Sequence, residues 1–138
     1  MVRAPAAGDN SPVTEARAVA SLHAVLRSRR LLDGVHMEDK VRDYIVSVAD
    51  ATRNPLKYCL MIGRLIRFGA SPRGSVFLAL AAKAEALLSG RDYVTPQDVK
   101  NIAMDVLRHR VSVTYEAEAE NISSEDVVQK ILDALPVP

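Results

Sequence analysis

Residues 66–90 read IRFGASPRGSVFLALAAKAEALLSG, and this stretch decides the fold that we expect. Ser71 is a good N-cap and Pro72 suits the first helical position, so the sequence predicts a helix from Pro72 to about Ser89, closed by Gly90. Apolar residues lie nearly all round this helix: Val76, Phe77, Leu78, Leu80, Ala81, Ala84, Leu87 and Leu88. A helix of this kind is central in a domain and has neighbours on several sides.

Arg73 falls in the first turn of that helix, where a cation is unexpected. A helix N-terminus carries partial positive charge and unpaired N–H groups, so it favours Asp or Glu. In one interpretation the arginine lies on the surface, its stem covers apolar area, and the dipole penalty is at most about 1 kcal/mol. In the other, Arg73 and the helix N-terminus face an anion together. The local residues leave both interpretations open.

Periodic apolar residues predict four more helices on either side of this one. The first covers residues 14–29 approximately, and its apolar stripe consists of Val19, Leu22 and Leu26. The second covers residues 37–52 and ends ahead of Pro55, because the residue before a proline avoids the helical region. The third begins at Pro96 and the last near Ser123.

Capping signals mark the start of the last two helices. Thr95 stands three residues before Asp98, and Ser123 stands three residues before Asp126, which is the spacing of a capping box. In that arrangement the hydroxyl and the carboxylate each accept a hydrogen bond from the other residue's backbone N–H.

Short extended pieces are expected at residues 65–68 and 110–115, and the polar stretch EAEAEN at residues 116–121 is expected to be exposed. The sum is an all-α fold, a compact bundle of about five helices with room for one very short β-strand pair.

Length and composition fit one helical domain over residues 13–138, after a disordered lead-in over residues 1–12. The net charge is +1, so no overall field attracts nucleic acid or an anionic membrane. No apolar run approaches the roughly 20 residues that span a bilayer, and the start lacks the apolar core of a signal peptide. We therefore expect a cytoplasmic protein or fragment with no nucleic-acid or membrane partner.

Side chains for catalysis or metal binding are not grouped in the sequence. His23, His36 and His109 have no Cys or acidic partner at ligand spacing, so we expect no metal site. Cys59 stands among apolar residues and is expected to be a buried structural thiol. A phosphate-binding P-loop requires G-x-x-x-x-G-K-[ST], and residues 63–71 lack both the spacing and the lysine. The isolated chain is therefore not expected to hydrolyse ATP.

Four motifs together carry a resemblance to a known family. They are DYIVSVADATRNP at residues 43–55, FGASPRGS at residues 68–75, GRDYVTP at residues 90–96 and VLRHR at residues 106–110. In this order they resemble the C-terminal helical lid domain of MoxR-family AAA+ ATPases, over roughly residues 35–138. Each motif alone is weak, but the combination is specific.

The resemblance implies a role for the first turn of the central helix. Arg73 falls on the family's sensor-2 arginine, which reaches from the lid to the γ-phosphate of ATP. Ser71, Arg73 and Gly74 are then the implied nucleotide-binding residues, although alanine is more usual than Gly74 at its position. ATP and Mg²⁺ are the cofactors implied for the intact protein, with tight binding to this chain alone not expected.

The resemblance also implies partners. They are an N-terminal α/β ATPase domain of the same chain, neighbouring subunits of a homo-oligomeric ring, expected to be a hexamer, and client proteins remodelled in a chaperone-like way. This chain would then be an excised lid domain. Two alternatives stay open: a free-standing helical protein-interaction module, and a small DNA-binding helical domain whose affinity would fall steeply with salt.

Overall fold

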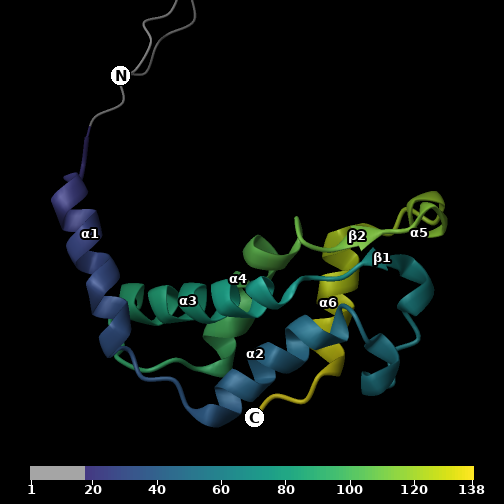
Figure 1. Ribbon diagram of the computed structural model, residues 1–138, viewed down its shortest axis with the longest axis horizontal. Helices are drawn as coiled ribbons and strands as arrows, with labels where there is room; N and C mark the ends of the chain where they lie inside the picture. Colours follow the sequence, from purple (N-terminus) through teal and green to yellow (C-terminus); the bar gives the residue numbers. More distant parts are fainter. Residues whose placement is uncertain (1–17) are drawn as a thin grey trace, which may run out of the picture.

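The computed structural model describes residues 18–138, and the predicted lead-in over residues 1–12 lies outside them. This part of the chain forms six α-helices and one two-stranded antiparallel sheet (Figure 1). The helices are α1 (Leu22–Leu31), α2 (Asp39–Ala51), α3 (Pro72–Leu88), α4 (Pro96–Leu107), α5 (Tyr115–Ala119) and α6 (Ser124–Ala134). The strands are β1 (Ile66–Phe68) and β2 (Ser112–Val113), and short 3-10 helices span Leu32–Gly34, Pro55–Tyr58 and Gly63–Leu65. The predicted mostly helical fold with one small strand pair is confirmed.

The packing of α3 against α4 forms the centre of the domain (Figure 1). The buried residues of α3 recur every four positions and are mostly small: Gly74, Leu78, Ala82 and Ala86. They meet an equally regular row on α4 that includes Val99, Ala103 and Leu107. Small side chains allow two helix backbones to approach closely, so this row fixes the position of α3 along α4.

Helices α2 and α6 complete the core. The predicted face of α2 is buried and consists of Val41, Tyr44, Ile45, Val48 and Ala49. On α6 the buried residues Val127, Val128, Ile131 and Leu132 face α4 and α2. Each set follows the spacing of one helical face, which is why the sequence located these helices correctly.

Both predicted capping boxes are present, at the starts of α4 and α6. The box of α4 is the more elaborate, because the buried carboxylate of Asp98 also accepts two hydrogen bonds from the Arg91 guanidinium, at 2.8 and 2.5 Å. These bonds, together with those from Thr95, lower the pKa of Asp98 to about 2. The GRDYVTP motif therefore builds a charged helix start inside the domain.

The first helix differs from its prediction. Residues 18–21 are not helical and α1 begins at Leu22, where Ser21 caps it by accepting a hydrogen bond from the Ala24 N–H at 3.1 Å; the predicted start near residue 14 lies outside the described residues. Val19, placed in its stripe by the sequence, precedes the helix and is exposed. No residue of α1 is buried; its C-terminal end lies near α3, and its N-terminal part extends away from the other helices (Figure 1).

One expectation about exposure holds with a single exception, and another is wrong. The EAEAEN stretch is exposed as predicted except at Ala117, which is fully buried, and it forms most of α5, which Thr114 caps. An ion pair between Arg64 and Glu120, at 2.7 Å, holds the end of this short helix. Cys59 is exposed rather than buried, since it ends the Pro55–Tyr58 segment in a left-handed conformation with φ of 57°.

None of the helices between residues 18 and 138 combines the length and the apolar character that crossing a bilayer requires. Within the same range, no three His, Cys, Asp or Glu side chains gather where they could hold a metal ion.

Candidate functional site

The first turn of α3 brings two of the three predicted site residues to the surface. Ser71 is the N-cap, as predicted, and its hydroxyl makes no capping hydrogen bond. Arg73 is exposed, and within residues 18–138 its guanidinium has neither a hydrogen bond nor an ion pair. The backbone N–H of Arg73 has no acceptor there either, because the residue four positions earlier lies outside the helix.

The electrostatics of this turn are those of an uncompensated positive end. The first turn of α3 contains no acidic residue, whereas those of α2, α4, α5 and α6 each contain at least one. The helix dipole, the free N–H of Arg73 and its guanidinium therefore add to one another at the same end. Chemically, this arrangement can hold an anion with a planar, permanently charged donor.

Gly74, the third predicted residue, is buried instead. A Cβ at this position would lie 3.2 Å from the Ala70 Cβ and 3.7 Å from side-chain atoms of Leu107 and Arg110. Its N–H is already bonded to the Ser71 carbonyl oxygen, at 2.7 Å. The missing side chain is thus explained by the close approach of Ala70, whereas the distances to Leu107 and Arg110 are those of ordinary contact.

One residue that the sequence did not predict holds the turn before α3, residues 69–71, against the end of α2. Thr52, at the end of α2, is fully buried and its Oγ1 accepts a hydrogen bond from the Ala70 N–H at 2.9 Å. The same hydroxyl donates to the Ala49 carbonyl oxygen at 2.7 Å. The sequence held one indication of this contact: the motifs that contain Thr52 and Arg73 occur together in the family that the sequence resembles.

A basic cavity of about 520 Å³ lies beside the contact of Thr52 with the turn before α3, between the end of α2 and Gly69. Arg53, Lys57 and Arg67 contribute its cations. Lys57 is neutralised by Asp50 at 2.8 Å, and hydrogen bonds from Lys57, Asn54 and Tyr58 lower the pKa of Asp50 to about 2. Arg53 approaches Asp50 only to 3.7 Å, so its charge is held more loosely.

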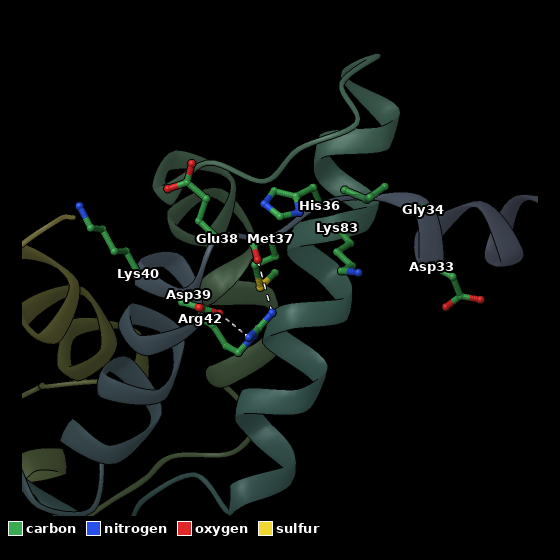
Figure 2. A pocket seen from close by; sticks show the side chains of 10 residues that line it. Asp33, Gly34, His36, Met37, Glu38, Asp39, Lys40, Arg42 and Lys83 are labelled. Atoms are coloured by element: carbon green, nitrogen blue, oxygen red, sulfur yellow. Dashed lines mark hydrogen bonds and ion pairs between the residues drawn. The ribbon is translucent and has the colours of Figure 1, made fainter.

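Another cavity lies elsewhere and contains none of the predicted residues. It measures about 650 Å³ and is formed by residues 33–40, Arg42 and Lys83. Figure 2 shows that Lys40, Arg42 and Lys83 point in different directions, and Arg42 is occupied by Asp39 and the Met37 carbonyl oxygen. Lys83 follows Arg73 by ten residues, roughly 15 Å along the helix. The charges of this cavity do not converge, so it is not the candidate site.

An uncovered apolar surface continues from Arg73 along α3. Val76, Phe77 and Leu80 follow Arg73 at three, four and seven residues, so they share its side of the helix. Each is about half exposed, and together we call them the apolar face of α3. The prediction that α3 has neighbours on several sides is confirmed, since α2, α4 and the Leu32–Gly34 segment all contact it. The apolar face is the side that residues 18–138 leave partly open, with the Arg110 guanidinium over the Phe77 ring.

Comparison with known proteins identifies the fold that carries this turn. The profile of the family described as "AAA lid domain" matches residues 61–131, which include α3, α4 and most of α6. The chain belongs to the AAA lid domain family. Within it, this lid is of the MoxR type, as its relatives indicate.

The lid is 38% identical over 125 residues to Chaperone MoxR1 of Mycobacterium tuberculosis, which covers 90% of this chain and 33% of that protein. It is 38% identical over 116 residues to Protein MoxR of Paracoccus denitrificans, covering 76% of this chain and 33% of that protein. A crystal structure from Cytophaga hutchinsonii, described as a candidate ATPase, has a TM-score of 0.80 at 38% identity and covers 84% of this chain and 36% of its own. The lid thus spans about a third of the length of the curated relatives that it matches.

Proposed function

We propose that this lid closes over ATP bound on an N-terminal α/β ATPase domain of the same protein and presents Arg73 to the γ-phosphate. The observation that carries the proposal is the first turn of α3, where Arg73 is exposed, has no partner within residues 18–138 and adds to the positive end of the helix. Membership of the AAA lid domain family supports the same assignment.

An arginine at this place would sense the nucleotide by simple electrostatics. The guanidinium forms strong paired hydrogen bonds with phosphate oxygens, and these bonds depend on the terminal phosphate. Because ATP and ADP differ in that contact, hydrolysis changes the relative stability of the closed and open positions of the lid. Arg73 would also stabilise charge that develops on the phosphoryl group during transfer.

The other two predicted residues, Ser71 and Gly74, have different roles in this proposal. The unbonded hydroxyl of Ser71 is available to a phosphate oxygen beside Arg73. Gly74 is not available, because its N–H is bonded and its Cα faces Ala70 and α4, so we assign it to packing. Mg²⁺ would accompany ATP on the α/β domain, and this lid would supply no ligand to it.

We further infer that the intact protein forms a ring and acts in the cytoplasm as a chaperone-like remodelling ATPase. The uncovered apolar face of α3 and the exposed α1 support a larger assembly, since both offer apolar side chains to a partner. The description of one relative as a chaperone supports the remodelling role.

The test is Arg73→Ala in the intact ATPase. We expect ATP turnover at saturating ATP to fall at least tenfold, and Arg73→Lys to recover little, because lysine keeps the charge but lacks the planar fork. Lys130→Ala removes an exposed cation on α6 and should leave turnover near that of the unmodified protein. Unchanged turnover and ring assembly in Arg73→Ala would refute the proposal.

A further inference from the structure

We propose that Thr52 is a positioning residue for Arg73: its buried hydroxyl ties the end of α2 to the turn that starts α3. The inference rests on the proposed function of Arg73 and adds the device that sets its direction. It concerns a side chain that makes no contact with the nucleotide.

The hydroxyl of Thr52 donates one hydrogen bond and accepts another. It donates to the Ala49 carbonyl oxygen at 2.7 Å and accepts from the Ala70 N–H at 2.9 Å. Thr52 and Ala70 are both fully buried, so neither the hydroxyl nor the N–H can turn to water instead. A buried N–H without an acceptor is strongly unfavourable, and the turn must therefore keep Ala70 against Thr52.

Two close contacts remove the remaining freedom of the turn. A Cβ at Gly69 would overlap the Thr52 carbonyl oxygen, so the backbones of the two segments touch directly. On the other side, the Ala70 Cβ fills the space in front of Gly74, at 3.2 Å from the place where a side chain would begin. Residues 69–71 are thus held between the end of α2 and the first turn of α3.

This arrangement fixes the backbone of Arg73 and leaves its side chain free. Ala70 precedes Arg73 by three residues, and the helix that follows is rigid, so an error at Ala70 displaces the origin of the guanidinium. Displacements of about 1 Å can cost a hundredfold in rate when a catalytic group must meet a phosphate. Thr52 belongs to a fully buried polar contact between the ATRNP and GASPRG segments, which explains why a hydroxyl stands where valine would fill the same space.

The first measurement is hydrogen exchange of the Ala70 amide in the 138-residue chain. Thr52→Val removes the hydroxyl and keeps the volume, and we expect the Ala70 amide to exchange at least tenfold faster. Thr52→Ser keeps the hydroxyl and should stay within about threefold of the unmodified rate. Unchanged exchange in Thr52→Val would overturn the inference, because the hydrogen bond would not hold the turn.

The matched control is Thr114→Val, at the start of α5. The Thr114 hydroxyl also makes two hydrogen bonds, donating to the Arg64 carbonyl oxygen at 2.8 Å and accepting from the Ala117 N–H at 3.3 Å. It does not contact the turn before α3, so this variant should leave both Ala70 exchange and ATP turnover unchanged. An equal loss of turnover in both variants would show a merely structural role and overturn the inference.

The second measurement is ATP turnover of the intact ATPase. We expect about a tenfold loss in Thr52→Val, recovery in Thr52→Ser, and no further loss when Thr52→Val is added to Arg73→Ala. Full activity of Thr52→Val beside an impaired Arg73→Ala would overturn this inference alone. Full activity of Arg73→Ala would instead overturn the proposed function, and Thr52 would then have no nucleotide-binding group to position.

Discussion

Asp98 and Arg73 both stand in the first turn of a helix, and the domain treats their charges in opposite ways. Asp98 is buried, accepts hydrogen bonds from Arg91 and Thr95, and lies at the positive end of α4, where a carboxylate is favourable. Arg73 lies at the positive end of α3, is exposed, and has no partner within residues 18–138. One charge stabilises the lid itself, whereas the other is available to a ligand.

Replacing Asp98 with Asn tests the first of these roles. The change keeps the volume but removes the negative charge, and since the pKa falls from 3.8 to about 2, we expect a loss of about 2 kcal/mol in the free energy of unfolding at pH 7. Asp126→Asn, in the exposed capping box of α6, is the matched control and should lose less. Urea unfolding of the 138-residue chain measures both, and equal losses would contradict the role of burial.

The lowered pKa of Asp98 also predicts how the free energy of unfolding depends on pH. The folded chain binds the Asp98 proton less readily than the unfolded chain, so this stabilisation is complete above about pH 4 and is lost as the pH falls toward 2. Unfolding free energies measured between pH 5 and 2 should therefore fall more steeply for the unmodified chain than for Asp98→Asn. Parallel curves would show that Asp98 is not the titrating group.

At the scale of elements, the sequence predicts a helix best where one face is buried by the chain itself. The apolar spacing located α2, α4 and α6 because each buries a regular row of side chains in the domain. It also predicted α1, but not that its stripe is exposed or that residues 18–21 precede the helix, whose start is capped by Ser21. It also missed α5, which has five residues, too few to show a period, and is held by Ala117 and the Arg64–Glu120 ion pair.

In the candidate site, too, the sequence predicts the features that depend on local chemistry and misses those that depend on packing. Ser71 and Arg73 could be placed from the sequence, because capping residues and the first turn follow from local chemistry. Thr52 could not, since its partner Ala70 is 18 residues away and the contact exists only when α2 and the turn meet. For Gly74, the contact with Ala70, Leu107 and Arg110 likewise depends on how α3 packs against α4.

A pair of substitutions on α3 measures how differently its two sides contribute. Leu78 is fully buried against the core, and Leu80 belongs to the apolar face and is 47% exposed. We expect Leu78→Ala to lower the free energy of unfolding by about 2–5 kcal/mol and Leu80→Ala by less than about 1 kcal/mol. Thermal or urea unfolding of the 138-residue chain decides this, and similar losses would mean that both sides of α3 are covered.

At the scale of the whole molecule, the lid presents apolar surface on α3 that residues 18–138 leave about half exposed. Phe77 and Leu80 of the apolar face border a cavity of about 570 Å³, which is also lined by Arg29 of α1, Leu32, Asp33, Asp105, Val106, His109 and Arg110. Above this region α1 extends away from the other helices (Figure 1). Uncovered apolar side chains that adjoin a candidate phosphate contact are what a surface closing onto a second domain requires.

Double substitution of Phe77 and Leu80 with serine tests that surface. Because both side chains are about half exposed, the melting temperature of the 138-residue chain should change by only a few degrees. In the intact ATPase, assembly measured by analytical ultracentrifugation and ATP turnover should both decrease. Val46→Ser, at an exposed apolar position on α2, is the control and should affect neither. Normal assembly and turnover in the double variant would exclude the apolar face from the closing surface.

The exposed Cys59 has a practical consequence. It is the only cysteine of the 138-residue sequence, and it follows the Pro55–Tyr58 segment beside the junction of α2 with the turn before α3. A thiol-reactive fluorophore can therefore be attached to this chain at one defined point without any substitution. Paired with a second dye on a nucleotide analogue, this fluorophore would report the distance between lid and nucleotide in a single molecule during each catalytic cycle.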